Sequence, residues 1–251
     1  MKRVLMAALL GLFPSFAEAH FQELIPSTDI LPGQGEANLR LDLRFTHPME
    51  RGPLMDMAAP QQFGVLAAGK KTDLRPQLQK ASEGGKTIFT ASYRPALPGD
   101  YVFYVAPAPY WEAAEGKYIQ HFAKVVVDFA SGGGWDKLVG LPVEIEPLVR
   151  PYGLWTGNLF RGIIRQNGKP LPFAEIEVEW RNDGTVTAPS DPFITQVIKA
   201  DAGGQFSYAM PRAGWWGFAA LVDGKPMAAP NGKMVPVEQG GVMWVKVVDM
   251  K

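Results

Sequence analysis

The stretch ANLRLDLRF, residues 37–45, carries the pattern that decides the fold class. Its apolar side chains fall at positions 39, 41, 43 and 45, with arginine or aspartate between them. Because successive side chains of a strand point to opposite faces, this alternation predicts a strand with one buried face. Comparable strand-like runs follow at residues 62–68, 86–93, 99–107 and 118–129.

Turn-forming residues separate these runs along the whole chain. The sequence has 27 glycines and 22 prolines among 251 residues, and few segments show helical periodicity. Short strands between glycine and proline turns are typical of β-sandwiches. We therefore predict an all-β protein built from two β-sandwich domains.

A connector divides the two expected domains. Residues 130–157 contain a triple glycine and several later glycine and proline sites, which interrupt the strand pattern. We place the boundary near residue 148, giving an N-terminal sandwich over 20–148 and a C-terminal sandwich over 149–251. Strand-like runs resume after the connector, and Asn167-Gly168 is a strong signal for a hairpin turn.

The first 19 residues have the features of a secretory signal peptide. Lys2 and Arg3 precede a short apolar run, and Ala-Glu-Ala at positions 17–19 resembles a cleavage site. The run is about half the roughly 20 residues that a transmembrane helix needs, and no later stretch is as long. We expect a soluble, periplasmic protein that begins at His20 after cleavage and does not span the membrane.

Charge and composition exclude several functions. The 25 basic and 25 acidic side chains balance, which argues against nucleic acid or an anionic membrane as the partner. The chain has no cysteine, so disulfides, thiolate metal sites and thiol nucleophiles are excluded. No hydrolase motif and no glycine-rich loop opening a helix is present. We expect a protein that is not an enzyme.

The three histidines, His20, His47 and His121, all lie before the connector. Cleavage after Ala19 would give His20 a free α-amino group, which can chelate a metal together with ring Nδ1. The amine has an ordinary pKa of about 7.7–8.0, so a divalent metal can displace its proton near neutral pH. With one imidazole nitrogen each from His47 and His121, such a site suits Ni(II), Co(II), Cu(II) or Zn(II).

Each histidine also has a purely structural interpretation. His121 lies in the middle of a strand-like run, where a buried histidine bonded to backbone is common. His47 precedes Pro48 and fits a turn. His20 would stand at a chain end, and chain ends are often frayed.

Neighbouring residues leave a copper alternative open. Met49, Met55 and Met57 follow His47, and thioethers favour Cu(I), although methionine is also an ordinary core residue. Glu23, Glu50 and Asp56 are candidates for additional ligands or for hydrogen-bond partners of ligands. Solvated surface charges are the commoner role for such carboxylates.

Two resemblances to known families extend the interpretation. The stretches GIIRQNGKPLPFAEIEV (162–178) and ADAGGQFSY (200–208) resemble the transthyretin-like or carboxypeptidase-regulatory-like sandwich, which bears on fold alone. The stretches FTHPMERGP (45–53), EIEPLVRPYGL (144–154) and RAGWWGFAAL (212–221) resemble the periplasmic component of cobalt/nickel uptake systems. That second resemblance spans nearly the whole chain after residue 19.

The second resemblance implies an exported protein that binds a transition metal and supports its import through an ABC-type or energy-coupling-factor transporter. The recurring histidines of that family match His20, His47 and His121. We therefore expect capture of nickel or cobalt for uptake. The alternatives are a periplasmic copper carrier, a histidine-brace copper enzyme, and a metal-free adhesion or carbohydrate-binding sandwich.

Overall fold

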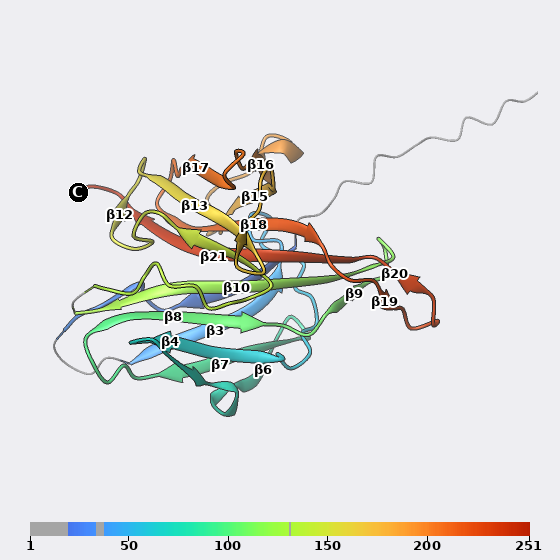
Figure 1. Ribbon diagram of the computed structural model, residues 1–251, viewed down its shortest axis with the longest axis horizontal. Coiled ribbons are helices and arrows are strands. Elements are labelled where there is room, and N and C mark those ends of the chain that lie inside the picture. Colours follow the sequence, from blue (N-terminus) through green and yellow to red (C-terminus); the bar gives the residue numbers. More distant parts are fainter. Residues whose placement is uncertain (1–19, 34–37, 131) are drawn as a thin grey trace, which may run out of the picture.

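The protein is built almost entirely from strands, as the alternation predicted. Figure 1 shows the computed structural model, which describes residues 20–33, 38–130 and 132–251. The regular structure there consists of strands and two 3-10 turns, Arg75–Gln77 and Asp191–Phe193. No helix in those ranges is long and apolar enough to cross a membrane. The predicted signal peptide, residues 1–19, lies outside the described residues.

A large central sheet of 11 strands runs through the molecule. Its main path is β16-β15-β18-β21-β10-β8-β4-β5, and the short strands β12, β2 and β9 pair at its sides. The bounds are β16 Gln196–Lys199, β15 Glu175–Trp180, β18 Gly214–Asp223, β21 Val237–Val248, β10 Lys117–Phe129, β8 Gly99–Ala106, β4 Gln62–Ala67, β5 Lys70–Asp73, β12 Leu154–Trp155, β2 Ile30–Leu31 and β9 Tyr110–Glu112.

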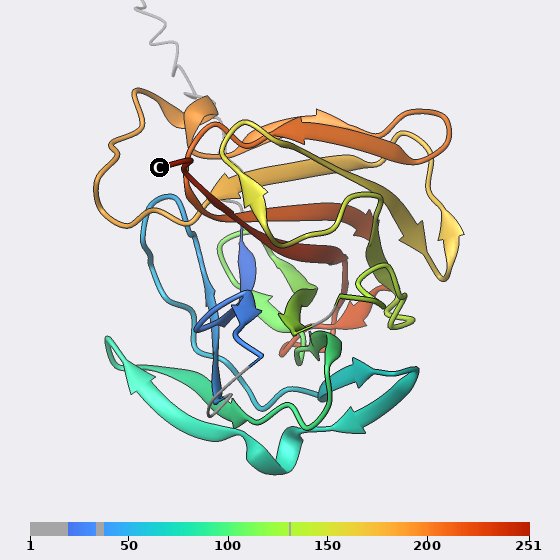
Figure 2. The ribbon, with the colours of Figure 1, turned by 90° about the vertical axis from the view of Figure 1, so that its left-hand side faces the viewer.

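Smaller sheets form the outer layers, which Figure 2 shows on either side of the central strands. The first has the order β1-β3-β7-β6, with bounds β1 Phe21–Pro26, β3 Leu39–Thr46, β7 Lys86–Tyr93 and β6 Gln79–Glu83. The second contains β11 Val143–Pro147, β13 Leu159–Gln166, β14 Lys169–Pro170 and β17 Gln205–Ala209. A separate two-stranded ribbon joins β19 Met227–Ala228 to β20 Met234–Val235.

Two local predictions from the sequence are confirmed. In β3 the leucines and Phe45 are buried, whereas Arg40 is exposed. Asn167 and Gly168 have φ values of 50° and 78° and join β13 to β14, as expected for a turn that requires positive φ. These features depend on neighbouring residues, so the sequence alone predicts them.

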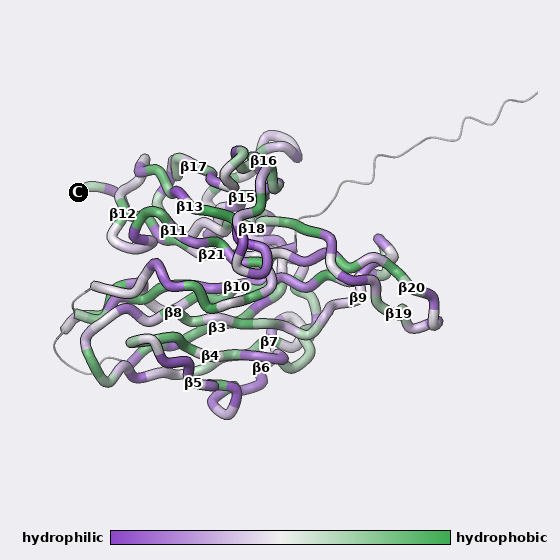
Figure 3. Tube along the Cα trace, viewed as in Figure 1, coloured by the Kyte–Doolittle hydropathy of each residue, from purple (hydrophilic) through white to green (hydrophobic). Residues whose placement is uncertain are grey.

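The central sheet has a hydrophobic core on each face. Along β10, Ile119, Ala123 and Val125 face the core beneath β1 and β3, whereas Phe122 and Val126 face the core beneath β13. β10 is therefore buried on both sides, and the polar residues Gln120, His121 and Lys124 are buried along with its apolar ones. Figure 3 shows apolar residues along the central strands and hydrophilic residues in β5 and β6.

Strands from both sides of residue 148 share the central sheet. β21, near the C-terminus, pairs in parallel with β10, and His121 stands opposite Gly240. Both expected domains contribute strands to this one continuous sheet. The division into two domains near residue 148 stays a prediction. The pairing also brings the C-terminal residues Glu238 and Gly240 next to His121.

A buried ion pair links the central sheet to the second outer sheet. Lys124 Nζ on β10 lies 2.7 Å from Glu144 Oε1 on β11, and the two side chains are 1% and 2% exposed. Glu144 also accepts N–H groups of Val139, Gly140 and Leu141. The carboxylate thus fixes part of the predicted connector against β10.

Replacing Lys124 with methionine should destabilise the protein. The substitution retains an unbranched side chain but leaves Glu144 buried without its cation, which typically costs about 3–5 kcal/mol of unfolding free energy. Urea denaturation would measure the loss. Lys137→Met, at a largely exposed lysine beside Asp136, is the matched control and should change stability by about 1 kcal/mol or less. Equal stability of the Lys124→Met variant and the wild type would contradict this role.

Candidate functional site

Antiparallel pairing of β1 and β3 brings His20 and His47 together. Phe21, the first residue of β1, pairs with Thr46, the last residue of β3, so the residues flanking this pair are neighbours. The two imidazole rings have centroids 4.6 Å apart and meet edge to face. Both histidines are buried, at 4% and 1% exposure. Two of the three predicted metal ligands therefore form a close pair.

A glutamate contacts each ring of this pair. His20 Nε2 lies 3.3 Å from Glu112 Oε2, and His47 Nδ1 lies 3.4 Å from Glu50 Oε2. In protein metal sites, a carboxylate on one imidazole nitrogen fixes the ring and directs the other nitrogen to the metal. For His20 the other nitrogen is Nδ1, which is the nitrogen that can chelate together with the residue's own α-amine.

His121 lies on the far side of a phenylalanine from this pair. The Phe45 ring is 5.5 Å from the His20 ring and 6.2 Å from the His121 ring, measured between centroids. Among the described residues, no group of three or more histidine, aspartate or glutamate side chains is arranged to hold a metal ion. Convergence of all three histidines on one ion thus stays a prediction.

The surroundings of His121 hold its ring firmly. Nε2 lies 3.2 Å from Glu238 Oε1, and Lys117 Nζ lies 2.7 Å from the other oxygen of that carboxylate. Burial raises the pKa of Glu238, but the hydrogen bonds and charges of His121 and Lys117 outweigh it and lower the pKa to about 2. A Cβ at Gly240 would come within 2.5 Å of His121 Cδ2, so only glycine fits there. In the part of the chain that is described, His121 Nδ1 is buried and has no hydrogen-bond partner.

An apolar pocket of about 230 Å³ adjoins His121. Phe45, Tyr110, Trp111 and His121 line it, together with the prolines of the segment before β9. The Tyr110 ring lies 6.5 Å from the His20 ring. Met49, Met55 and Met57 are all at least nine-tenths buried and belong to the two cores, which agrees with a packing role.

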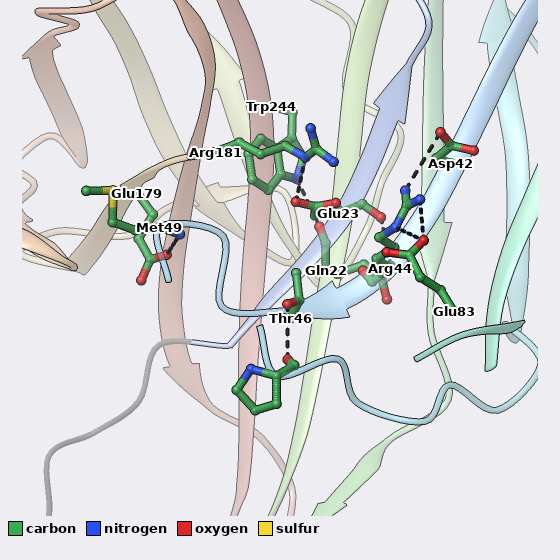
Figure 4. A network of polar contacts seen from close by, with 11 residues as sticks. Gln22, Glu23, Asp42, Arg44, Thr46, Met49, Glu83, Glu179, Arg181 and Trp244 are labelled. Atoms are coloured by element: carbon green, nitrogen blue, oxygen red, sulfur yellow. Dashed lines mark hydrogen bonds and ion pairs between the residues drawn. The ribbon is translucent and has the colours of Figure 1, made fainter. Parts of the chain in front are cut away.

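A segment from the C-terminal half holds the backbone directly after His47. Glu179, at the end of β15, accepts the N–H of Met49 at 2.9 Å and the hydroxyl of Thr195 at 2.6 Å. Asn182 donates its side-chain N–H to the Met49 carbonyl at 2.9 Å and its backbone N–H to the Pro48 carbonyl at 3.2 Å. Figure 4 shows Glu179 and Met49 in this arrangement. Residues 179–182 therefore clamp the turn that carries His47.

Two of the three glutamates of β15, Glu177 and Glu179, are buried, whereas Glu175 is exposed. Glu179 is 0% exposed and Glu177 is 8% exposed. Burial raises the pKa of Glu179 to about 8, against the lowering effect of its hydrogen bonds to Thr195 and Met49. Burial also raises the pKa of Glu177 to about 7, with a further rise from the charge of Glu238. The sequence of β15 does not reveal this for Glu179, because its hydrogen-bond partners, Met49 and Thr195, lie outside the strand.

The raised pKa of Glu179 predicts that stability falls with increasing pH. A carboxyl group with a higher pKa in the folded than in the unfolded chain stabilises fully below its ordinary value of 4.5. This contribution is lost as the pH rises through about 8. The unfolding free energy of wild-type protein should therefore decrease as the pH rises from 4.5 to about 8.

Glu179→Gln should make that decrease shallower, because the amide has nearly the same shape and cannot ionise. Urea unfolding at several pH values between 4.5 and 8 would measure the slope. Glu175→Gln, at an exposed position of the same strand, is the matched control and should keep the wild-type slope. The same slope in the Glu179→Gln variant would show that Glu179 does not titrate in this way.

Comparison with known proteins assigns the chain to a family. The chain belongs to the family described as "Domain of unknown function (DUF4198)", whose model matches residues 17–224, a range that includes all three histidines. A search of curated proteins found no match. The description of this family names no function, so cobalt or nickel uptake, which the sequence resemblance implied, stays a prediction.

Solved structures show only distant similarity. The D0-D1 domain of intimin is 12% identical, with 90% of this chain and 99% of that chain covered and a TM-score of 0.27. The Yersinia pseudotuberculosis adhesin InvE is 13% identical, with coverages of 88% and 58% and a TM-score of 0.24. The native E. coli alpha-2-macroglobulin is 10% identical, with coverages of 91% and 14% and a TM-score of 0.25. Similarities at such TM-scores establish neither a shared fold nor a shared function.

Proposed function

We propose that this protein captures a divalent transition metal, nickel or cobalt, at a site centred on His20 and His47, for uptake by a membrane transporter. The observation that carries the proposal is the buried pair of imidazole rings, 4.6 Å apart, each contacted by a glutamate. Adjacent imidazoles with carboxylate partners are the arrangement that nitrogen-binding metals favour.

The proposal depends on cleavage of the bond between Ala19 and His20. Before cleavage, the His20 nitrogen belongs to a peptide bond, and an amide nitrogen that keeps its proton has no lone pair to give to a metal. Afterwards it is an amine beside Nδ1, the ring nitrogen opposite the Glu112 contact. His20 would then supply two nitrogens and His47 a third. The metal is the cargo in this proposal, and the protein has no catalytic role.

His121 is proposed as an additional ligand. Its Nε2 is bonded to Glu238, and its buried Nδ1 has no partner among the described residues, which is suitable for a ligand atom. The Phe45 ring contacts both His121 and His20, so a shared ion would require this ring to move. We expect His121 to contribute less to affinity than His20 and His47.

Periplasmic location and delivery to an ABC-type or energy-coupling-factor transporter are also part of the proposal. Both rest on the leader-like residues 1–19 and on the sequence resemblance. The clamp of residues 179–182 gives the C-terminal half a role in this scheme, because it holds the His47 turn in place.

Lengthening the N-terminus by one residue should weaken metal binding. Protein that begins at His20 is compared with protein carrying one added alanine, using calorimetric titration with Ni(II) and Co(II). Blocking the amine removes one ligand, so we expect the affinity to fall by about tenfold or more, equivalent to about 1.4 kcal/mol. His47→Ala should cause a similar loss.

A further test variant and one control variant show whether a loss of affinity is specific to the histidine site. Glu112→Gln should lower affinity by about 10- to 100-fold, as is usual for a partner of a ligating histidine. Asp136→Asn, at a half-exposed site outside the histidine cluster, should leave affinity unchanged. Equal affinity of the two N-terminal forms would eliminate the amine as a ligand. Failure of the mature form to bind either metal would contradict the proposed function.

Copper is the second candidate, because an N-terminal amine, its own imidazole and a second histidine form a histidine brace. Tighter binding of Cu(II) than Ni(II) would not decide between them, since most nitrogen sites have that preference. The metal retained by protein purified from a bacterial periplasm is the informative measurement. Copper in that preparation, with high affinity for Cu(I), would favour the copper function over nickel or cobalt uptake.

A further inference from the structure

A second cavity, of about 320 Å³, shares no lining residue with the pocket beside His121. We call it the arginine cavity. Strands β1, β3 and β6 supply part of its wall, and the His47 turn and the segment after β15 supply the rest. Figure 4 shows the ion pairs along its wall. Its charged lining residues are Glu23, Arg44, Arg51, Glu83, Arg181 and Asp183.

Most of these charges already have partners. Arg44 Nη2 lies 2.7 Å from Glu83 Oε2, and Arg181 Nε lies 2.8 Å from Glu23 Oε1. Asp183 accepts hydrogen bonds from the amide and hydroxyl of Thr185. Within the described ranges, the second oxygen of Glu23 and the guanidinium of Arg51 have no such partner.

Glu23 is the buried charge of the cavity. The residue is 2% exposed, and its Oε2 atom has no hydrogen-bond partner among the described residues. Burial raises the pKa of this carboxyl, against the lowering effect of Arg181. A carboxylate oxygen buried without a donor is unfavourable, so a small shift of the Glu23 side chain that brings Oε2 against a ligand's donor or positive charge would be stabilised.

Arg51 is the exposed charge of the cavity. Its guanidinium packs against Gly184, where a Cβ would lie 2.7 Å from Nη1. In the part of the chain described by the structure, no carboxylate lies within ion-pair distance of this guanidinium. Arg51 therefore presents a positive charge suited to a ligand carboxylate, which arginine binds well.

We propose that the arginine cavity binds a zwitterionic ligand, either a free amino acid or a short peptide. The ligand carboxylate pairs with Arg51, and the ligand ammonium pairs with Glu23 Oε2. An anion would leave Glu23 Oε2 without a hydrogen-bond donor, and a simple cation would leave Arg51 without a carboxylate, whereas a zwitterion supplies both. The cavity volume lies at the lower end of the range of about 300–1,000 Å³ that is typical of small-molecule sites. The site contains no histidine, so its occupancy does not depend on the metal proposal.

Calorimetric titration of the full chain with alanine and with trialanine tests this inference. The two probes distinguish a free amino acid from a peptide. N-acetyl and C-amide derivatives of each probe remove one charge at a time, and we expect either change to weaken binding by about tenfold or more. Glu23→Gln and Arg51→Gln should each cause a comparable loss. Arg40→Gln, at an exposed arginine outside the cavity, should bind like the wild type.

Each outcome decides the proposal. Binding of at least one zwitterion, with a loss on removing either charge, supports it. Equal binding of the acetylated form would indicate a site for anions alone, and equal binding of the amide a site for cations alone, so either result overturns it. Binding of neither zwitterion also overturns it. Because Arg51 is exposed, Arg51→Gln should fold normally and keeps the test valid even if Glu23→Gln unfolds the protein.

Discussion

The parallel pairing of β10 with β21 is the constraint on which the rest of the structure depends. β10 is buried on both faces, and the N–H and C=O groups of a buried strand must be paired. β21 satisfies those groups along the edge of β10 that β8 and β9 leave open. The same pairing places Gly240 against the His121 ring, where no side chain fits. The N-terminal half is therefore completed by the C-terminal end of the chain.

His20, His47 and His121 have both apolar and polar neighbours. The Phe45 ring packs against His20 and His121, and a glutamate contacts each of the three histidines. Buried polar groups there have partners from distant parts of the sequence: Glu179 with Met49, Glu23 with Arg181, and Glu238 with His121. An unpaired buried charge is costly, so such pairs fix the segments that carry them. The polar network in Figure 4 thus positions the His47 turn and also forms the wall of the arginine cavity.

Local patterns predicted much of the fold and part of the site. Alternation identified β3, the Asn167-Gly168 pair identified a hairpin, and the scarcity of histidine singled out His20, His47 and His121. Glu50, one of the carboxylates named as a possible additional ligand or hydrogen-bond partner, lies beside His47. Glu112, Glu179 and Glu238 were missed, since each meets its partner through strand pairing and layer packing.

By itself, the sequence determined the all-β class, the strand faces and the residue types available for metal chemistry, because these follow from periodicity and composition. Only the tertiary structure decided that His20 and His47 are adjacent while Phe45 contacts both His20 and His121. It also decided that Glu177 and Glu179 of β15 are buried. The physical reason is that burial and side-chain proximity depend on which strands pair and which layers stack, and residues far apart in the chain determine both.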